Sequence, residues 1–462
     1  MASSVGLFPP LERPLSLAAA LASLPRSRDI SEALPHRHLS LGACHLVEKR
    51  NTAMTRTASD SPPDDQAKSA AEHDPAAEKA LSRMVFWLAS GAFAIGCTEF
   101  AAMSLLPYYA RGFGISEPMA GHAVSAYAFG VVIGAPVIAT LCGRMSRKTL
   151  LIALMIAFAL GNLLAACAPS AWMLIASRFL SGLPHGAYLG IAMLFAAEVA
   201  GKGRRARMVS YVILGLTIAN IIGVPAVNAL GQAAGWRMAF VAITALAFLT
   251  VVMVWRTAPA DGRHPEASPL AELRAFRNRD VLLALAMGAI GFGGMFAVYA
   301  FFSATLIQET DSPEWLVSAV LILFGIGATL GNWVAGRVSG GHLLAAAGAY
   351  QAVLGAAALF YAFSVGHWPS MALAILLIGM GGGMAVPLQT RLMDVAGEAQ
   401  TLAAAMNHAA FNFANALGPL LAGAALAAGW GPRAPGFVGL GLALCGLAIW
   451  AVMMWLERKP KR

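Results

Sequence analysis

The stretch IGAPVIATLCGRMSRKTLL, residues Ile133–Leu151, occurs a second time in the chain as IGATLGNWVAGRVSGGHLL, residues Ile326–Leu344. Eight of the 19 aligned positions are identical without a gap, at an offset of 193 residues. In both copies an apolar run ends near a Gly-Arg pair, and another apolar run begins a few residues later. Self-similarity of this kind predicts two structurally equivalent units in one chain.

Two shorter matches support the same repeat. The motif Ala-Asn-x-x-Gly occurs at Ala219–Gly223 and again at Ala414–Gly418, an offset of 195. The sequence AAGW occurs at Ala233–Trp236 and again at Ala427–Trp430, an offset of 194. Chance could produce one such match in a chain rich in Ala and Gly. Three matches at nearly one offset indicate an internal duplication.

The composition excludes an ordinary soluble enzyme. The 462 residues are 58% hydrophobic and 12% charged, with a mean hydropathy of +0.67. A soluble domain carries about 25% charged residues, so half of the usual charge is missing. The same apolar content excludes a chain that is disordered throughout. The five cysteines form no CxxC pair, so we interpret them as packing residues and expect no disulfide framework and no metal site.

From Met84 onward, apolar runs long enough to cross a bilayer alternate with short polar breaks. The sequence predicts twelve membrane-spanning helices: Met84–Leu106, Ala123–Leu141, Leu150–Ala168, Trp172–Ala200, Met208–Ala229, Met238–Trp255, Val281–Leu306, Leu316–Val338, Leu343–Val365, Trp368–Leu388, Leu402–Ala428 and Gly436–Leu456. The long break Arg256–Asp280 divides them six and six. Because six is an even number, the two repeats have the same orientation. The predicted fold class is therefore an all-α membrane protein with two parallel six-helix repeats.

Lys and Arg residues predict the orientation, because cytoplasmic loops of membrane proteins are enriched in them. A cytoplasmic N-terminus puts twenty on the inner side: Lys79, Arg83, Arg144, Arg147, Lys148, Lys202, Arg204, Arg205, Arg207, Arg256, Arg263, Arg274, Arg277, Arg279, Arg337, Arg391, Arg458, Lys459, Lys461 and Arg462. The outer loops then hold three: Arg111, Arg237 and Arg433. We expect both termini in the cytoplasm. Since topology accounts for the net charge of +9, we expect no nucleic acid partner.

The predicted organisation has five parts. Residues 1–83 read as a disordered tail rich in Ser, Pro and acidic residues, and Met54 is an alternative start of the chain. Residues 84–255 form the first six-helix bundle, 256–280 a cytoplasmic linker, 281–456 the second bundle and 457–462 a basic tail.

Four motifs carry a resemblance to a known family. They are GCTEF at Gly96–Phe100, ATLCGRMSRK at Ala139–Lys148, ASRFLSGLPHGAYLG at Ala176–Gly190 and GLTIANIIGVPAVNALG at Gly215–Gly231. Over about Met84–Leu456 the chain resembles the major facilitator superfamily. It is most similar to the twelve-span drug:proton antiporter branch and, within it, to arabinose/sugar-efflux-like permeases. The resemblance implies a substrate site near the bilayer midplane between two halves that rock against each other.

The resemblance assigns two motifs. It implies a cytoplasmic gate at Arg144, Arg147 and Lys148, although these cations also suit the inside-positive rule and the end of the preceding helix. The family's usual acid falls on Gly143, so the acidic partner of this gate is missing. It also implies an antiporter motif in the fifth helix, at Gly215, Asn220, Gly223 and Pro225, loosened by Val224.

Two charged residues stand clearly inside predicted spans, Glu99 in the first and Arg178 in the fourth. Charged groups at membrane depth are functional candidates. Glu99 is ~10 Å and Arg178 ~9 Å from the outer ends of their helices at 1.5 Å per residue. In the family fold both helices line the cavity, so we expect the two groups within reach of each other, directly or through one water. The pair is a candidate for proton coupling; the alternatives are a permanent ion pair that packs the helices and, for Glu99, a hydrogen bond to backbone near Pro107.

His185 lies seven residues after Arg178, on the same face of the helix. It can relay protons, since histidine exchanges a proton near neutral pH, or it can be a packing residue. In the second half the eleventh span offers Asn407, His408, Asn412 and Asn415. This polar set either binds a hydroxyl-rich solute or joins helices by hydrogen bonds. Weaker candidates for the cavity wall are Tyr299, Phe302 and Gln389.

These features predict a proton-coupled efflux transporter of the bacterial inner membrane for a small solute such as a sugar or a drug. It would be a monomer without a cofactor, driven by the proton gradient. The alternatives are proton-coupled uptake and a receptor-like relative that transports nothing. A membrane enzyme is disfavoured, because the sequence has no HExxH motif and no carboxylate near His185 or His408.

Overall fold

The computed structural model describes residues 75–142, 145–201, 204–262, 278–338, 342–396 and 400–458. The predicted N-terminal tail up to residue 74, the basic tail from residue 459, Arg144 and most of the predicted linker lie outside these ranges. Within them the secondary structure is entirely helical, and twelve segments are long and apolar enough to cross a membrane. This agrees with the fold class and the number of spans expected from the sequence. In lipid a helix satisfies its own backbone hydrogen bonds, which an isolated strand cannot do.

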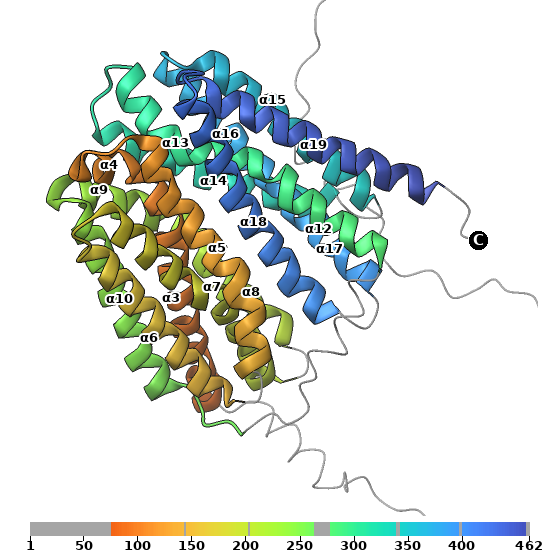
Figure 1. Ribbon diagram of the computed structural model, residues 1–462. Coiled ribbons are helices and arrows are strands. Elements are labelled where there is room, and N and C mark those ends of the chain that lie inside the picture. The colour runs from red at the N-terminus through yellow and green to blue at the C-terminus, as the bar shows by residue number, and fades with distance from the viewer. Residues whose placement is uncertain are drawn as a thin grey trace, which may run out of the picture. The chain divides into compact units, whose positions relative to one another are not determined.

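The first half of the described chain contains six spans, and the fifth is built from three elements. Its elements are α3 (Pro75–Ser104), α4 (Leu106–Phe113), α5 (Glu117–Cys142), α6 (Arg147–Ala166), α7 (Ala171–Ala200), α8 (Arg205–Ile218), η1 (Ala219–Gly223), α9 (Val224–Ala234) and α10 (Trp236–Thr257). The η1 segment is one π-helical turn inside span five. Helix α4 is short and caps one end of the bundle (Figure 1).

The second half also contains six spans, two of which are interrupted. Its elements are α12 (Arg279–Gly291), α13 (Gly293–Glu309), α14 (Trp315–Val338), α15 (Leu343–Ser364), α16 (Trp368–Gly381), η3 (Gly382–Met384), α17 (Ala385–Ala396), α18 (Gln400–Ala427) and α19 (Ala434–Glu457). Together α12 and α13 form one span, and α16, η3 and α17 form another.

The start of the first helix corrects one expected boundary. Helix α3 begins at Pro75, so residues 75–83 are helical rather than part of a disordered tail. The segment PAAEKALSR is polar enough to read as tail by hydropathy alone. Proline suits the first turn of a helix, and Ala, Glu, Lys and Leu are strong helix formers. The membrane span therefore extends backwards as a helix beyond its apolar part.

Glycines hold the corresponding helices of each half in close contact. In the first half α5 packs on α7, where a Cβ at Gly134 or Gly182 would overlap the carbonyl groups of Leu183 or Tyr127. In the second half α14 packs on α16, and Gly327 and Gly379 meet backbone carbonyls in the same way. Small residues allow backbones to approach in this manner in membranes. Equivalent pairs of helices in the two repeats are thus held together by the same kind of glycine contact.

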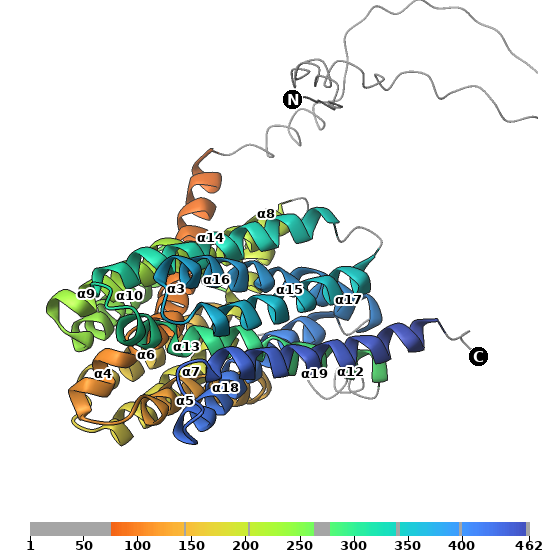
Figure 2. The ribbon, with the colours of Figure 1, turned by 90° about the horizontal axis from the view of Figure 1, so that it is seen from above.

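Contacts between the halves are concentrated at one end of the molecule. Helix α18 packs along α5, α13 packs on α3 and α4, and α14 packs on η1 and α9. Helix α8, the other part of span five, packs instead on α3 and α7 of its own half. We call the end with α4 the α4 face and the opposite end the terminal face. The bundles meet at the α4 face and diverge toward the terminal face, where α17 and the C-terminal end of α19 lie (Figures 1 and 2).

Candidate functional site

The carboxyl group of Glu99 lies at the contact between the two halves. Glu99 is on α3, in the part near the α4 face, and is 8% exposed. Its Oε1 accepts a hydrogen bond of 2.8 Å from Nδ2 of Asn415 on α18. A buried carboxyl group that is hydrogen-bonded to the opposite half must change its surroundings whenever the halves move.

Arg178 binds next to Glu99 rather than to it. The Arg178 side chain is 1% exposed and donates to Thr98 Oγ1 and to the Thr98 carbonyl oxygen, each at 3.1 Å. The Thr98 hydroxyl in turn donates to Asn162 Oδ1 at 2.5 Å. Within the described part of the chain Glu99 and Arg178 form no ion pair, so of the two expected arrangements, a direct contact or one through a water, the direct contact is absent. Successive residues of a helix point about 100° apart, so Thr98 faces α7 and α6 while Glu99 faces α18.

An aromatic ring joins Arg178 to His185. The guanidinium carbon of Arg178 lies 4.1 Å from the ring centroid of Tyr127 on α5, within cation–π distance. The Tyr127 hydroxyl and His185 Nδ1 share a hydrogen bond of 3.0 Å. The ring of His185 then meets the ring of His408 on α18, with centroids 5.6 Å apart and planes at 72°. The structure therefore brings His185 and His408 together from opposite halves.

Three asparagine side-chain oxygens of α18 have no hydrogen-bond partner. Asn407 Nδ2 donates to Gln389 Oε1 at 2.5 Å, and Asn412 Nδ2 donates to the His408 carbonyl at 3.0 Å. The Oδ1 atoms of Asn407, Asn412 and Asn415 are buried and have no partner. Buried polar groups are normally hydrogen-bonded, so these three unpartnered acceptors can accept hydrogen bonds from a solute.

The two aromatic candidates of α13 differ in position. Tyr299 is 1% exposed, and its ring centroid lies 5.5 Å from that of Phe100, the neighbour of Glu99. Phe302 is fully buried and packs on Tyr361 of α15 with centroids 6.1 Å apart. Tyr299 is therefore beside the Glu99 contact, whereas Phe302 is inside the second half and away from it.

The described residues of the expected cytoplasmic gate motif make contacts inside the first half. Arg147 pairs with Glu198 at the end of α7. The ammonium group of Lys148 donates to the Ala258 carbonyl at 2.6 Å. Arg144, the third member of the motif, is outside the described residues. The described members thus join α6 to α7 and to the segment after α10.

An acid that the sequence did not reveal completes this cluster. Asp261 accepts from the Ser146 hydroxyl and the Arg147 backbone N–H, both at 2.6 Å, and from the Lys148 N–H at 3.2 Å. A carboxylate at the N-terminus of α6 is favoured by the helix dipole. The missing acid at Gly143 is therefore compensated by two carboxylates, Glu198 and Asp261, from other segments. Asp261 lies 118 positions later in a polar stretch, and nothing local marks it.

The motif of span five is a packing device around the π-helical turn. Gly215 lies against the backbone of Ala89, and Gly223 lies against Cys97, both on α3. The backbone carbonyl of Asn220 lies against Gly325 of α14 in the other half. Pro225 is buried at the start of α9. This motif therefore fits span five closely to helices of both halves.

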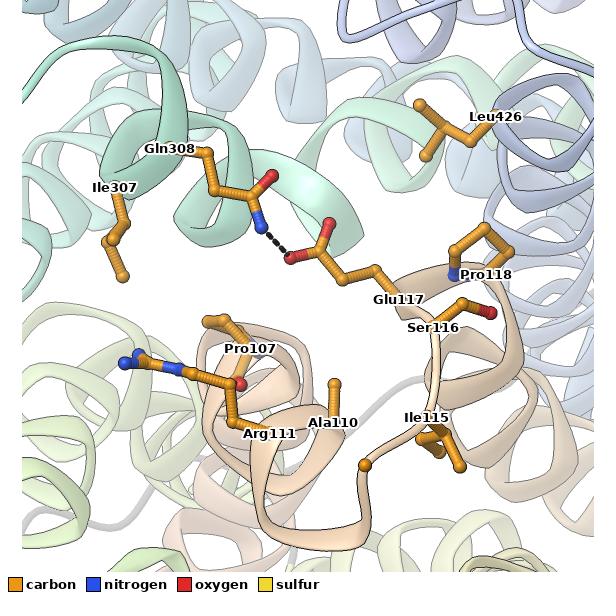
Figure 3. Close-up of a pocket in the computed structure, with 11 residues that line it drawn as sticks. Pro107, Ala110, Arg111, Ile115, Ser116, Glu117, Pro118, Ile307, Gln308 and Leu426 are labelled. Carbon is orange, nitrogen blue, oxygen red and sulfur yellow. Dashed lines mark hydrogen bonds between the residues drawn. The ribbon is translucent and has the colours of Figure 1, made fainter.

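At the α4 face, exposed polar groups connect the halves. Arg111 of α4 donates from both terminal nitrogens to Glu314 at 3.0 Å. Gln308 of α13 donates to Glu117 of α5 at 2.5 Å across a cavity of about 550 Å³ (Figure 3). Burial and the nearby charge of Glu314 raise the pKa of Tyr108 to about 12, so its hydroxyl stays neutral and accepts from Gln232 at 3.0 Å.

Known proteins share this sequence and arrangement. The family model described as Major Facilitator Superfamily matches residues 88–400. The inner membrane transport protein YdhP of Escherichia coli is 38% identical over 376 residues, which cover 81% of this chain and 96% of that protein. A chloramphenicol resistance protein of Streptomyces lividans is 30% identical over 361 residues, which cover 74% of this chain and 88% of that protein.

A solved structure gives the same fold. The crystal structure of a point mutant of the nucleoside transporter NupG matches with a TM-score of 0.66 and 13% identity, covering 81% of this chain and 100% of that one. With twelve apolar helices and a family match over most of those spans, the chain belongs to the major facilitator superfamily of membrane transporters.

Proposed function

We propose that the protein exports a small solute across the bacterial inner membrane in exchange for protons. The single observation that carries the proposal is the hydrogen bond between Glu99 and Asn415. It puts a buried titratable carboxyl group at a contact that alternating access must break and re-form. Since charged groups are costly at membrane depth, Glu99 changes protonation most readily when the halves move and its surroundings change.

The remaining parts of the site give the exchange a physical order. Arg178 is held by Thr98 and Tyr127 inside the first half, so it supplies a fixed positive charge beside Glu99. When Glu99 is protonated, closure of the site buries no carboxylate charge. When Glu99 opens to the terminal face it loses its proton, and its carboxylate is stabilised by Arg178. The proton gradient is the only driving force that this scheme needs.

Export is favoured over uptake by one of the relatives. The Streptomyces lividans protein is named for chloramphenicol resistance, and removal of the drug from the cell is one way to produce resistance. The free Oδ1 atoms of α18 favour a neutral solute with hydroxyl or N–H groups, such as a sugar or chloramphenicol. The inside-positive count supports a cytoplasmic position of both termini, and in this proposal the terminal face is the cytoplasmic side.

Flux measurements in vesicles test the proposal. Purified protein is reconstituted with a pH-sensitive dye inside, a pH gradient is imposed, and chloramphenicol and a panel of neutral sugars are added in turn. We expect one of these probes to dissipate the gradient, and Glu99→Gln to reduce this flux at least tenfold. Glu309→Gln, which changes an exposed carboxylate at the end of α13, is the matched control and should transport normally.

Unchanged proton flux in Glu99→Gln would remove Glu99 from the mechanism. Probe movement in the same direction as the proton would show uptake instead of export. Probe equilibration that is independent of the gradient would show a uniporter.

A further inference from the structure

The histidines at the contact between the halves form a separate feature from Glu99. Along α7, His185 follows Arg178 by seven residues, and along α18, His408 precedes Asn415 by seven. Two turns of helix correspond to ~10 Å. The site therefore has two levels: Glu99, Asn415, Thr98 and Arg178 form the level nearer the α4 face, and the histidines form the level nearer the terminal face.

Among the residues that the structure describes, the histidine pair comes last in a series of contacts between α18 and the first half. Going along α18 from the α4 face, Gly423 lies beside Pro118 and the Ala416 carbonyl accepts from Ser125 at 3.0 Å. Phe413 then packs on Phe129 with ring centroids 6.4 Å apart. His408 on His185 comes last in this series. The two bundles diverge toward the terminal face (Figure 1).

The surroundings of the two rings disfavour two positive charges. The hydroxyl of Tyr127 on α5 is hydrogen-bonded to His185, the guanidinium group of Arg178 on α7 lies over the Tyr127 ring, and the carboxyl group of Glu99 on α3 lies one level away. Within the described part of the chain, neither ring has a carboxylate partner. The Nε2 atoms of both rings are buried without a hydrogen bond, so each ring has a nitrogen atom available for a proton.

We infer that His185 and His408 form a second proton-binding site, divided between the two halves, which controls closure at the terminal side of the transport site. With at most one ring protonated, the edge-to-face contact can form. With a proton on each ring, the rings repel each other and the halves separate at this level. Each proton comes from water on the terminal side and returns to it, so no other reactant is needed. The role of the histidine site in transport rests on the proposed function. The contact between the rings itself requires neither a substrate nor a gradient.

Distance measurements on the full chain test this inference without a substrate. Spin labels are placed at Tyr211 of α8 and Trp333 of α14, which are 47% and 56% exposed, in a variant that lacks the native cysteines. The label-to-label distance distribution is recorded in lipid nanodiscs between pH 8 and pH 5. We expect the population with the larger distance to grow as the pH falls, because both rings become protonated.

Three variants decide the outcome. His408→Gln and His185→Gln each leave one titratable ring, and both should lose this pH response. His408→Lys supplies one of the two charges from an ammonium group, so protonation of His185 alone should then separate the halves, and the larger distance should appear at a higher pH than in the wild type. His367→Gln, at an exposed position before α16, is the matched control and should respond like the wild type.

A wild type without a pH response, or a response that persists in both Gln variants, overturns the inference. If His185→Gln does not fold because it loses the hydrogen bond to the Tyr127 hydroxyl, the test rests on His408→Gln alone. The Glu99→Gln variant keeps both rings and should still respond. A response that disappears in Glu99→Gln but persists in the histidine variants would assign the effect to Glu99 instead. Failure here leaves the vesicle experiment on Glu99 unaffected, and failure there leaves this one unaffected.

Discussion

Helix α5 packs mainly on two helices, α7 and α18, and it contacts them in different ways. Toward α7 the contact is backbone to backbone, and glycines leave no room for a side chain. Toward α18 it is made by side chains, such as the Ser125 hydroxyl and the Phe129 ring. The first contact lies inside one half, and the second lies between the halves.

The difference shows which parts of the molecule can move. A close-packed backbone contact has a single geometry, because small displacements produce steric overlap. A contact of hydroxyl groups and rings can be broken and re-formed with small changes in free energy. We therefore expect substitutions inside a half to affect folding, and substitutions between the halves to affect the balance of conformations.

The largest effect is expected at the glycine contact inside the first half. Gly134→Ala puts a Cβ onto the Leu183 backbone, which cannot move away as a flexible side chain could. Overpacking costs about 1–3 kcal/mol, more than the roughly 1 kcal/mol that Ala gains over Gly in a helix. Thermal unfolding in detergent should show a lower Tm and a lower yield of folded protein. The control Gly190→Ala faces open space and should be neutral or stabilising; equal melting of both variants would contradict the rigid contact.

A smaller loss of stability is expected on the terminal face. Asp261→Asn replaces a carboxylate that accepts two backbone N–H groups at the start of α6. Asparagine keeps one acceptor oxygen but loses the negative charge, which at a helix N-terminus is worth about 0.3–1 kcal/mol. The control is Asp280→Asn, also in the first turn of a helix, where the carboxylate lies 3.8 Å from the exposed Arg279. Limited proteolysis after α10 should be faster in Asp261→Asn only, and identical digestion would show that Asp261 does not anchor this segment.

The smallest effect on stability is expected at the α4 face. An effect on the conformation of the molecule is expected there as well. Arg111 and Glu314 are 57% and 43% exposed, and exposed pairs contribute about 0–1 kcal/mol. Arg111→Ala, Glu314→Ala and the double variant should melt within one degree or two of the wild type. Opening of the α4 face should increase, as measured by cysteine labelling at Pro107. High salt should reduce the difference from the wild type, and a loss of several kcal/mol would show that this junction is as rigid as the bundle interior.

The sequence predicted the spans well because hydropathy reports directly on insertion in lipid. The repeat and the number of spans needed only runs of apolar residues and three matched motifs. The start of α3 at Pro75 was missed because a helix can continue beyond its apolar part, where hydropathy gives no signal.

The site was predicted less completely, for a geometrical reason. Spacing in sequence tells which residues share a face of one helix, but not how that helix is rotated against its neighbours. Their depth predicted that Arg178 and Glu99 lie close together. The orientation of α3, however, turns Thr98, the residue before Glu99, toward Arg178, and Thr98 makes the contact instead. The meeting of His185 and His408 likewise depends on the packing of two helices that are 223 residues apart.

The π-helical turn at Ala219–Gly223 bears on the history of the duplication. From Ala219 to the AAGW motif at Ala233 the first copy has 14 steps, and from Ala414 to Ala427 the second copy has 13. The second copy of the motif lies within the uninterrupted α18. A π turn accommodates one extra residue within a helix, so the turn absorbs the one residue by which the two copies differ in length here. The two copies of the motif therefore differ in local backbone geometry, and they are no longer interchangeable at this point.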